Sequence, residues 1–494
     1  RPHGSNMSSG KTLLTGTTGF LGVRLLAALL GDGVNCVALA RDGKTTAALR
    51  VRAALDELGS PARDVPVIAC DLRDRKPSGH DDITRIVHVA ASTRFNFDAS
   101  NEPFATNVAG TRNLLAFATD RGVRDFHYVS TAYVSASVKT SFEKPASKSS
   151  TPRNAYERSK RDAEQLALDW AAADSSRSLT IYRPSIIVGE FADGRSEKFD
   201  GFYIAIRAFE LLAKRRGRLA GAPIRIEGSD SGHQNIVPID WVTKTIVAVL
   251  KSPAHHGRIY HLTNPYPPAN LLIRSVMGQH FGLGAMTIVE KLHSATEAEQ
   301  IFSDAASTIR PYMVESPQFD RSNTEEIERL TGQACPTYES AALSRLVSYA
   351  TATRYGQRPA SPLSRDDRAF CTTFFERFLP VRIAQSRVAI AAAMTVVVRF
   401  SIDLDDWTCR FIHGRLANIS RATDPAEDFA YTLSANGFFE VLSASRPPQD
   451  LFFTGEATIT GDVERALKMI MIFEAFLREF PCTHQSLAEL QVAS

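Results

Sequence analysis

The stretch TLLTGTTGFLGVRLLAALL, residues 12–30, constrains the fold of this chain more than any other segment. Its three glycines, Gly16, Gly19 and Gly22, follow a short apolar run and precede a longer run whose leucines recur at helical spacing. This pattern predicts a strand, a tight turn and a helix. The N–H groups in the first turn of such a helix point at the space above the strand, a position that favours phosphate.

Further apolar runs predict more strands of the same sheet. They recur at intervals that leave room for a helix between them, and they comprise VNCVALARD (34–42), VPVIACDLRD (65–74), ITRIVHVAAS (83–92) and RDFHYVSTAYVSA (124–136). Alternating strands and helices of this length predict an α/β, Rossmann-type fold with a doubly wound parallel sheet. Such a sheet binds its ligand at the carboxyl ends of the strands.

Composition narrows the class of protein. The 494 residues, 44% of them hydrophobic, predict two or three globular domains. The net charge of +3 comes from mixed signs spread along the chain, so nucleic acid is not an expected partner. Six scattered cysteines fit a reducing, cytoplasmic location. The longest uncharged apolar run, residues 388–398, is too short to span a bilayer, and residues 1–8 resemble a tag remnant.

The histidines give no sign of a metal site. His88 lies inside an expected strand and reads as a core residue. The pair His255 and His256, in SPAHHGR, looks like an exposed loop without a cysteine or carboxylate at metal-ligand spacing. We therefore expect no bound metal.

A candidate acid–base group lies in NAYERSKRDAEQLAL. Tyr156 and Lys160 are four residues apart on an expected helix, so their side chains share one face. A phenol has a pKa of about 10, and a neighbouring ammonium lowers that pKa by favouring phenolate. Two hydroxyls, Ser130 and Thr131, end the preceding strand, where either could hydrogen-bond a substrate oxygen beside Tyr156.

Several motifs in order carry a resemblance to a known superfamily. They are TGTTGFLG, CDL, VHVAAS, NVAGTRNLL, VSTAYV, YERSK and YRPSIIVG. Residues 12 to about 340 resemble an extended short-chain dehydrogenase/reductase, which implies a domain over 9–350 with its substrate part mainly at 185–345. IVHVAASTRFNF and NVAGTRNLLAFA resemble the branch of fatty acyl-CoA reductases and terminal thioester reductases.

The resemblance assigns roles to individual residues. It implies a catalytic triad of Thr131 (or, less favoured, Ser130), Tyr156 and Lys160, in which Tyr156 protonates the substrate oxygen. It also implies a set of cofactor-binding residues: Gly16, Thr18, Gly19, Phe20, Leu21, Gly22, Arg41, Asp71, Leu72, Ala90, Ala91, Asn107, Ser130, Tyr156, Lys160 and Pro184.

The end of the second expected strand indicates which dinucleotide binds. An NAD enzyme of this architecture places an acid there for the ribose 2′-hydroxyl, whereas this chain has Arg41, which suits a 2′-phosphate. The neighbouring Asp42 leaves NAD open at this point. We expect NADPH.

The last third of the chain has a different pattern. After a polar stretch at 351–365 that predicts a linker, residues 366–494 alternate like strands of an antiparallel sheet and end in an amphipathic helix. This order, with Gly455, Gly461 and Asp462, resembles the sterol carrier protein-2 domain, an α+β lipid-binding module. Apolar residues of this part fit either a core or a lipid tunnel: Phe438, Phe439, Leu442, Met469, Met471 and Phe473.

Both halves imply one class of substrate. The resemblance implies NADPH-dependent reduction of a fatty or similarly apolar acyl thioester, carried on coenzyme A or a carrier protein, to aldehyde or alcohol. One alternative is an NADP-dependent dehydrogenase of a lipid or sterol hydroxyl or ketone. Another is a non-catalytic lipid-binding protein with a nucleotide-sensing domain.

Overall fold

The computed structural model describes residues 10–482 apart from internal gaps. The gaps are 44, 61–64, 96–100, 136–137, 147–149, 215–223, 230, 285, 308, 315–316, 357–364, 404, 422–423, 425, 444–446, 449–450 and 452–456. The expected tag remnant and most of the expected linker therefore lie outside the described residues. The chain divides into two compact units, Arg1–Gly356 and Gln357–Ser494, which we describe separately.

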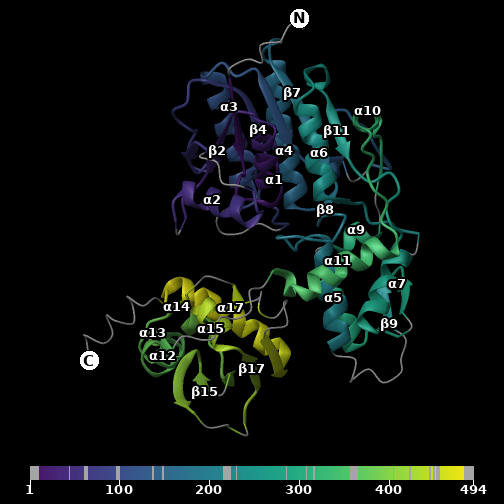
Figure 1. Ribbon diagram of the computed structural model, residues 1–494. Helices are drawn as coiled ribbons and strands as arrows, with labels where there is room; N and C mark the ends of the chain where they lie inside the picture. The colour runs from purple at the N-terminus through teal and green to yellow at the C-terminus, as the bar shows by residue number, and fades with distance from the viewer. Residues whose placement is uncertain are drawn as a thin grey trace, which may run out of the picture. The chain divides into compact units, whose positions relative to one another are not determined.

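A seven-stranded sheet forms the centre of the first unit (Figure 1). The strand order is β11-β7-β5-β4-β1-β2-β3, and every neighbouring pair is parallel. The predicted Rossmann-type sheet is thus confirmed. Its strands are β1 (Lys11–Thr15), β2 (Cys36–Ala40), β3 (Val67–Ala69), β4 (Ile83–His88), β5 (Asp125–Val129), β7 (Ser178–Pro184) and β11 (Ile259–Leu262).

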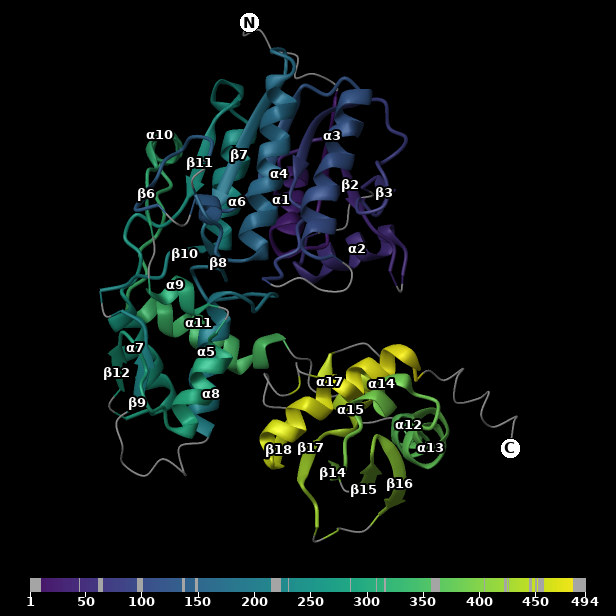
Figure 2. The same ribbon diagram turned by 180° about the vertical axis from the view of Figure 1, so that it is seen from behind.

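Helices cover both faces of this sheet (Figures 1 and 2). One face packs against α1 (Phe20–Gly31), α2 (Ala47–Glu57), α6 (Ile239–Leu250) and α10 (Ser322–Thr331), and the other against α3 (Gly110–Asp120) and α4 (Ala155–Ala172). Successive residues of β1 point to opposite faces, so Leu14 joins the first core and Leu13 the second. Burial on both faces explains why these strands are apolar throughout.

A smaller part packs around its own apolar core beyond the carboxyl ends of the strands. A short parallel pair, β6 (Thr140–Ser141) with β13 (Gln318–Phe319), lies next to β11 (Figure 2). The smaller part contains two other parallel pairs, β8 with β10 and β9 with β12. Its strands are β8 (Ile186–Val188), β9 (Ile224–Glu227), β10 (Ile236–Pro238) and β12 (Met286–Val289). Its helices are α5 (Phe202–Lys214), α7 (Asn270–Phe281), α8 (Glu297–Ala305), α9 (Arg310–Val314) and α11 (Ser340–Ala352).

The second unit is an α+β arrangement around a five-stranded sheet of order β16-β15-β14-β17-β18. Its strands are β14 (Val396–Ile402), β15 (Asp405–Ile412), β16 (Arg415–Ser420), β17 (Phe429–Leu433) and β18 (Ala457–Gly461). Its helices are α12 (Arg365–Thr373), α13 (Leu379–Ile383), α14 (Arg387–Ala392), α15 (Ala435–Leu442) and α17 (Val463–Glu479), with a π-helical turn, η6 (Phe374–Phe378), between α12 and α13.

Two expectations for this unit are wrong in detail. The sheet is mixed, because β14 pairs with β17 in parallel while the other three pairs are antiparallel. Alternating side chains show which face of a strand is buried and carry no information on the direction of its neighbour. Met471 is 68% exposed and is not a core residue, whereas Phe438, Leu442 and Met469 are buried. Gly455 lies outside the described residues.

None of the helices in the described part of the chain combines the length and the apolar character that a membrane span needs.

Candidate active site

The glycine-rich turn joins β1 to α1 at the point where the strand order reverses. Gly16 has φ of +72°, and a Cβ on this residue would lie 2.8 Å from the backbone nitrogen of Ala90. A Cβ on Gly22 would lie 2.1 Å from the carbonyl oxygen of Gly16. Any side chain at these two positions would therefore separate β1, β4 and α1.

The first turn of α1 suits a phosphate. Gly19 is the N-cap residue, no side chain caps the helix, and the first turn contains no acidic residue. Its N–H groups and the positive end of the helix dipole therefore face the cleft without a competing anion from the cap. These features fit the pyrophosphate of a dinucleotide.

A cleft of about 660 Å³ runs from this turn into the smaller part of the unit. Sixteen of the predicted site residues line it: Gly16, Thr18, Gly19, Phe20, Leu21, Gly22, Arg41, Asp71, Leu72, Ala90, Ala91, Ser130, Thr131, Tyr156, Lys160 and Pro184. The volume is in the range of small-molecule and cofactor sites. At its other end the lining is mixed, with Ile186 and Ile309 as well as Lys198 and Asp200.

Asn107 is the exception, because it does not line the cleft. It is buried, its Oδ1 accepts from the backbone N–H of Ser92 (2.7 Å), and its Nδ2 donates to Oγ of Ser159 (2.8 Å). Ser159 in turn donates to the carbonyl of Tyr156 (2.8 Å). Asn107 thus connects the segment after β4 to the helix that carries Tyr156, and its amide is fully used by protein partners.

A hydrogen-bond network behind the cleft fixes the end of β4. Thr15 Oγ1 accepts from the backbone N–H groups of Val89 and Ala90 and lies 2.8 Å from Nδ1 of His88. The other ring nitrogen of His88 lies 3.0 Å from Thr111 Oγ1. Burial lowers the pKa of His88 to about 3, so the ring is neutral and acts as a structural bridge. The sequence did not indicate the role of Thr15.

Tyr156 and Thr131 meet at the cleft from different elements. Tyr156 lies in the first turn of α4, where Asn154 Oδ1 caps the helix by accepting from the N–H of Glu157 (2.9 Å). Thr131 follows the last residue of β5 by two positions and is 4% exposed. Burial raises the pKa of Tyr156 well above its ordinary value, and a hydrogen bond with Thr131 opposes the rise.

Lys160 is buried below Tyr156 on the same helix. Its Nζ donates to the carbonyl of Val129 (2.6 Å) and lies 4.4 Å from the centre of the Tyr128 ring. Burial lowers the pKa of Lys160 to about 7, and Glu164 opposes this. The expected lowering of the phenol pKa by Lys160 stays a prediction: the ammonium donates to the carbonyl of Val129, and burial has the largest effect on the pKa of Tyr156.

The end of β2 presents basic groups to the cleft. Arg41 and Arg50 both line it, and Nη1 of Arg50 donates to the carbonyl of Arg41 (2.6 Å). Asp42 is not among the residues that line the cleft, and its Oδ1 accepts from the N–H of Ala47 at the start of α2 (2.8 Å). Arg73, a third arginine of the lining, is ion-paired with Asp71 (2.7 Å).

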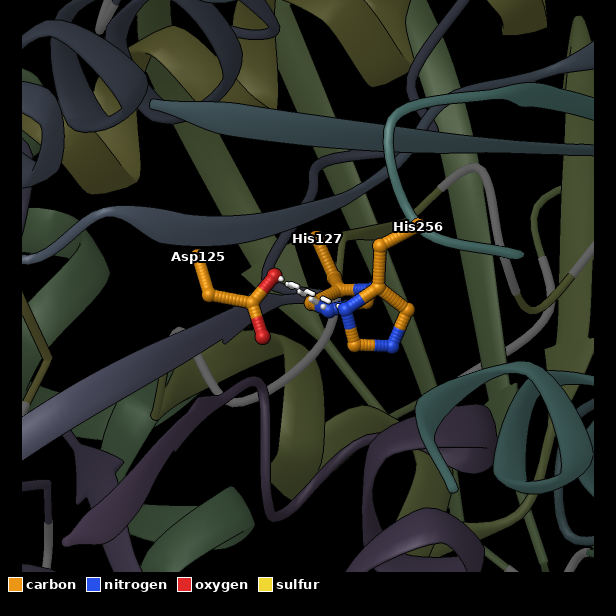
Figure 3. A group of neighbouring side chains, drawn as sticks. All are labelled: Asp125, His127 and His256. Atoms are coloured by element: carbon orange, nitrogen blue, oxygen red, sulfur yellow. Dashed lines mark ion pairs between the residues drawn. The ribbon is translucent and has the colours of Figure 1, made fainter. Parts of the chain in front are cut away.

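The expectation of an exposed loop at His255 and His256 is wrong. The His256 side chain is 8% exposed, and its ring packs edge-on against that of His127 with centroids 4.6 Å apart. Its Nδ1 lies 3.3 Å from Oδ1 of Asp125, at the amino end of β5 (Figure 3). This cluster lies at the opposite end of β5 from Thr131.

The doubly wound sheet, its cleft at the strand-order reversal and the glycine-rich turn define a Rossmann-type dinucleotide-binding fold. Residues 14–246 match the NAD-binding family described as male sterility protein. This match supports a nicotinamide dinucleotide as the ligand of the cleft and an oxidoreductase as the class of protein.

The chain is also similar to parts of curated proteins. It is 27% identical over 298 residues to "Nonribosomal peptide synthetase asaC" of Aspergillus flavus, covering 54% of this chain and 27% of that protein. It is 31% identical over 230 residues to "Sterol demethylase protein B" of Methylococcus capsulatus, covering 42% of this chain and 66% of that protein. This chain therefore spans about a quarter of the synthetase.

Two solved structures share the fold. The terminal R domain from the myxalamid PKS-NRPS pathway aligns with a TM-score of 0.59 at 23% identity, over 71% of this chain and 92% of that one. A thiolation-reductase di-domain from an archaeal non-ribosomal peptide synthetase aligns with a TM-score of 0.55 at 20% identity, over 72% of this chain and 78% of that one. At this identity the likeness concerns the fold alone.

Proposed function

We propose that the first unit is an NADPH-dependent reductase of an acyl thioester, carried on coenzyme A or a carrier protein. The observation that carries the proposal is the meeting of Thr131, Tyr156 and Lys160 in one cleft with the glycine-rich turn. The names of the similar proteins support the reaction class, because two of them are a terminal reductase domain and a thiolation-reductase di-domain. Ile186 and Ile309, two apolar residues of the lining, support an apolar acyl group.

The residues of the cleft would act on the thioester carbonyl. When bound, the reduced nicotinamide supplies a hydride to the carbonyl carbon. Thr131 holds the carbonyl oxygen, and Tyr156 donates its phenolic proton to that oxygen as negative charge develops there. Its raised pKa keeps the phenol protonated at neutral pH, which suits a proton donor. The carbon–sulfur bond then breaks, giving an aldehyde and a free thiol.

Lys160 would have two tasks in this scheme. Its ammonium binds the ribose of the dinucleotide, and its charge stabilises the phenolate that Tyr156 becomes after proton transfer. Glu164, one turn further along α4, favours the charged form of Lys160 in the buried site.

Arg41 and Arg50 support NADPH over NADH. Both line the cleft beyond the end of β2, where the ribose 2′-position of a dinucleotide lies in folds of this kind. Guanidinium groups match a 2′-phosphate, whereas the only carboxylate close by in sequence, Asp42, already accepts from Ala47.

The second unit would hold the apolar chain of the substrate. Its α+β organisation supports a likeness to sterol carrier protein-2, and an apolar cavity lies between α13, α14 and α17. The cavity measures about 30 Å³, room for a few water molecules at most, so an acyl chain would have to part these helices. Leu379, Ile383, Met469 and Phe476 are among its walls.

A second candidate reaction is oxidation or reduction of a lipid or sterol hydroxyl or ketone. The 31% identity to a protein named for sterol demethylation favours it. The same triad serves both reactions, because each places negative charge on an oxygen beside Tyr156.

A substrate panel separates these functions. The full chain is incubated with NADPH and acyl-coenzyme A thioesters, acylated carrier protein or ketosteroids, and with NADP⁺ and hydroxysteroids. Products are identified by mass spectrometry, and the Tyr156→Phe variant is the control for background turnover. Aldehyde or alcohol from thioesters supports the proposal. Turnover of steroids alone supports the second candidate. Binding of lipid without turnover of any substrate would support the alternative of a non-catalytic lipid-binding protein.

A further inference from the structure

Three side chains with metal-binding atoms converge at the amino end of β5, away from the cleft (Figure 3). Asp125 and His127 are two residues apart on this strand, so they project from the same face. His256 comes from the turn between η4 (Pro253–His255) and β11. Asp125 Oδ1 lies 3.0 Å from His127 Nε2 and 3.3 Å from His256 Nδ1.

Each of the three side chains has a further polar contact outside the cluster. His256 Nε2 lies 3.1 Å from the carbonyl of Val249, and His127 Nδ1 lies 3.0 Å from Tyr182 Oη. The second oxygen of Asp125 accepts from Arg85 Nε (2.6 Å). Such outer contacts fix the orientation of ligating side chains in metal sites and raise their affinity for the ion.

The three facing atoms can turn lone pairs towards one point. The carbonyl of Val249 can only accept, so its contact with His256 places a ring proton on Nε2, and in the tautomer protonated there alone Nδ1 turns a lone pair towards the carboxylate. Asp125 Oδ1 and His127 Nε2 are buried without a hydrogen-bond partner among the described residues. Electron-rich atoms packed this closely are stabilised when a cation lies between them.

We propose that Asp125, His127 and His256 bind a first-row divalent cation of the Zn²⁺ type. Zinc binds imidazole nitrogen and carboxylate oxygen at about 2.0–2.2 Å, which separates neighbouring ligand atoms of a tetrahedron by about 3.3 Å. The two separations that involve Asp125, 3.0 and 3.3 Å, are close to this value, and all three ligand atoms lie within 4.8 Å of one another. Two imidazoles and one carboxylate make a donor set that suits zinc, with water as the fourth ligand.

The ion would stabilise the fold and take no part in the reaction. It would join the segment before β11 to the start of β5, two strands that both pair with β7 in the sheet. The candidate catalytic residues lie beyond the other end of β5, so this site is independent of the proposed function. Loss of the site would lower stability and leave the substrate specificity unchanged.

Metal binding by the full chain tests the proposal. The protein is stripped with a chelator and titrated with ZnCl₂, and in parallel with CoCl₂ as a spectroscopic probe. We expect one equivalent of zinc per chain, a rise in the thermal midpoint, and cobalt absorption bands of a tetrahedral site. All six cysteines are buried, so they do not compete for the ion.

Variants assign the ligands. His256→Gln and Asp125→Asn should each weaken zinc binding by more than about 100-fold, because even an outer-contact substitution costs about 10–100-fold. Tyr182→Phe keeps the aromatic ring and removes only its contact with His127, so it should weaken zinc binding by about 10–100-fold. This variant keeps the test open if the other two fail to fold. His255→Gln is the matched control, because its Nδ1 lies 3.8 Å from Glu326 outside the cluster.

Two results would overturn the proposal. One is a wild-type chain that binds neither zinc nor cobalt at millimolar concentration. The other is an equal affinity of the His255→Gln, His256→Gln and Tyr182→Phe variants for zinc. Either result would assign the cluster to packing of the loop alone.

Discussion

Tyr312 Oη donates a hydrogen bond to Glu157 Oε1 at 2.7 Å and thereby connects α9 to the first turn of α4. The Glu157 carboxylate is fully buried, and it also accepts from the guanidinium of Arg153 (2.8 Å). Asn154 Nδ2 donates to the same phenol oxygen (2.9 Å). Because Tyr156 is the neighbour of Glu157, this network positions the candidate proton donor relative to the smaller part of the unit.

Tyr312→Phe should therefore lower both stability and turnover. It removes one hydrogen bond of a buried carboxylate, which costs about 1–3 kcal/mol in the free energy of unfolding measured with urea. Tyr355→Phe is the matched control, because Tyr355 Oη donates to Glu210 at the same distance of 2.7 Å, away from α4. If both variants lose stability but kcat falls equally in both, Tyr312 has no positioning role.

Tyr156→Phe should reduce kcat by about 10²–10⁴-fold while affinity for the dinucleotide stays nearly intact. The substitution removes the proton donor and very little binding surface. Tyr133→Phe, another buried tyrosine of the cleft lining, is the control and should retain most activity. Near-full turnover by the Tyr156 variant would contradict the assignment of the proton donor.

The pattern of residues predicted most of the first unit. Glycine spacing and buried apolar runs located β1 to β5, and helical spacing placed Tyr156 and Lys160 on one face of α4. These signals are local, and the parallel sheet gathers the carboxyl ends of its strands at one edge. The role of Asn107 was not predicted from the pattern, because its partners Ser92 and Ser159 become neighbours only through packing.

The features that the sequence analysis predicted wrongly depend on tertiary structure. His256 belongs to a cluster with Asp125 and His127, residues far away in the sequence, and no spacing rule connects the two segments. Met471 follows the helical spacing of its neighbours but lies on the exposed side of α17, because apolar residues occur around much of that helix. The parallel pairing of β14 with β17 depends on the route of the chain between β16 and β17.

Affinity for NADPH should fall as the pH rises from 7 to 9. Burial lowers the pKa of Lys160 to about 7, so the charged form that binds ribose is lost above that pH. A 2′-phosphate has its second pKa at about 6 and adds little change in this range. Dissociation constants from fluorescence titration at several pH values measure the effect. Lys160→Met should bind weakly at every pH, and a wild-type affinity independent of pH would contradict the assignment.

Arg41→Ala should lower the preference for NADPH over NADH by about 10–100-fold. A charge-assisted contact with the 2′-phosphate contributes about 1.5–3 kcal/mol, and NADH has no such phosphate. The measurement is the ratio of kcat/KM for the two dinucleotides. Arg73→Ala is the control, because this arginine is paired with Asp71. Equal efficiency of the wild-type chain with NADH and NADPH would refute the choice of cofactor.

Removal of the second unit should abolish the preference for long acyl chains. Each buried methylene contributes about 0.8 kcal/mol at most to the binding free energy of the acyl chain. Only an enclosed apolar site buries the methylenes and so gains this free energy. A chain ending at Gly356, the boundary of the first compact unit, should still reduce a short thioester. Its kcat/KM across a series of chain lengths is compared with that of the full chain. An unchanged dependence on chain length would indicate a structural role for residues 366–494.

The hydrogen bond from Ala47 to Asp42 limits how this protein could evolve towards the other coenzyme. An acid introduced by Arg41→Glu would stand directly before Asp42, and the two carboxylates would repel each other at the rim of the cleft. If Asp42 turned to the ribose instead, the N–H of Ala47 would lose its acceptor. Thr46 would then be the remaining side-chain cap at the start of α2. A change of coenzyme therefore requires coordinated substitutions at these positions, and libraries that vary Arg41 alone should not yield an efficient NADH enzyme.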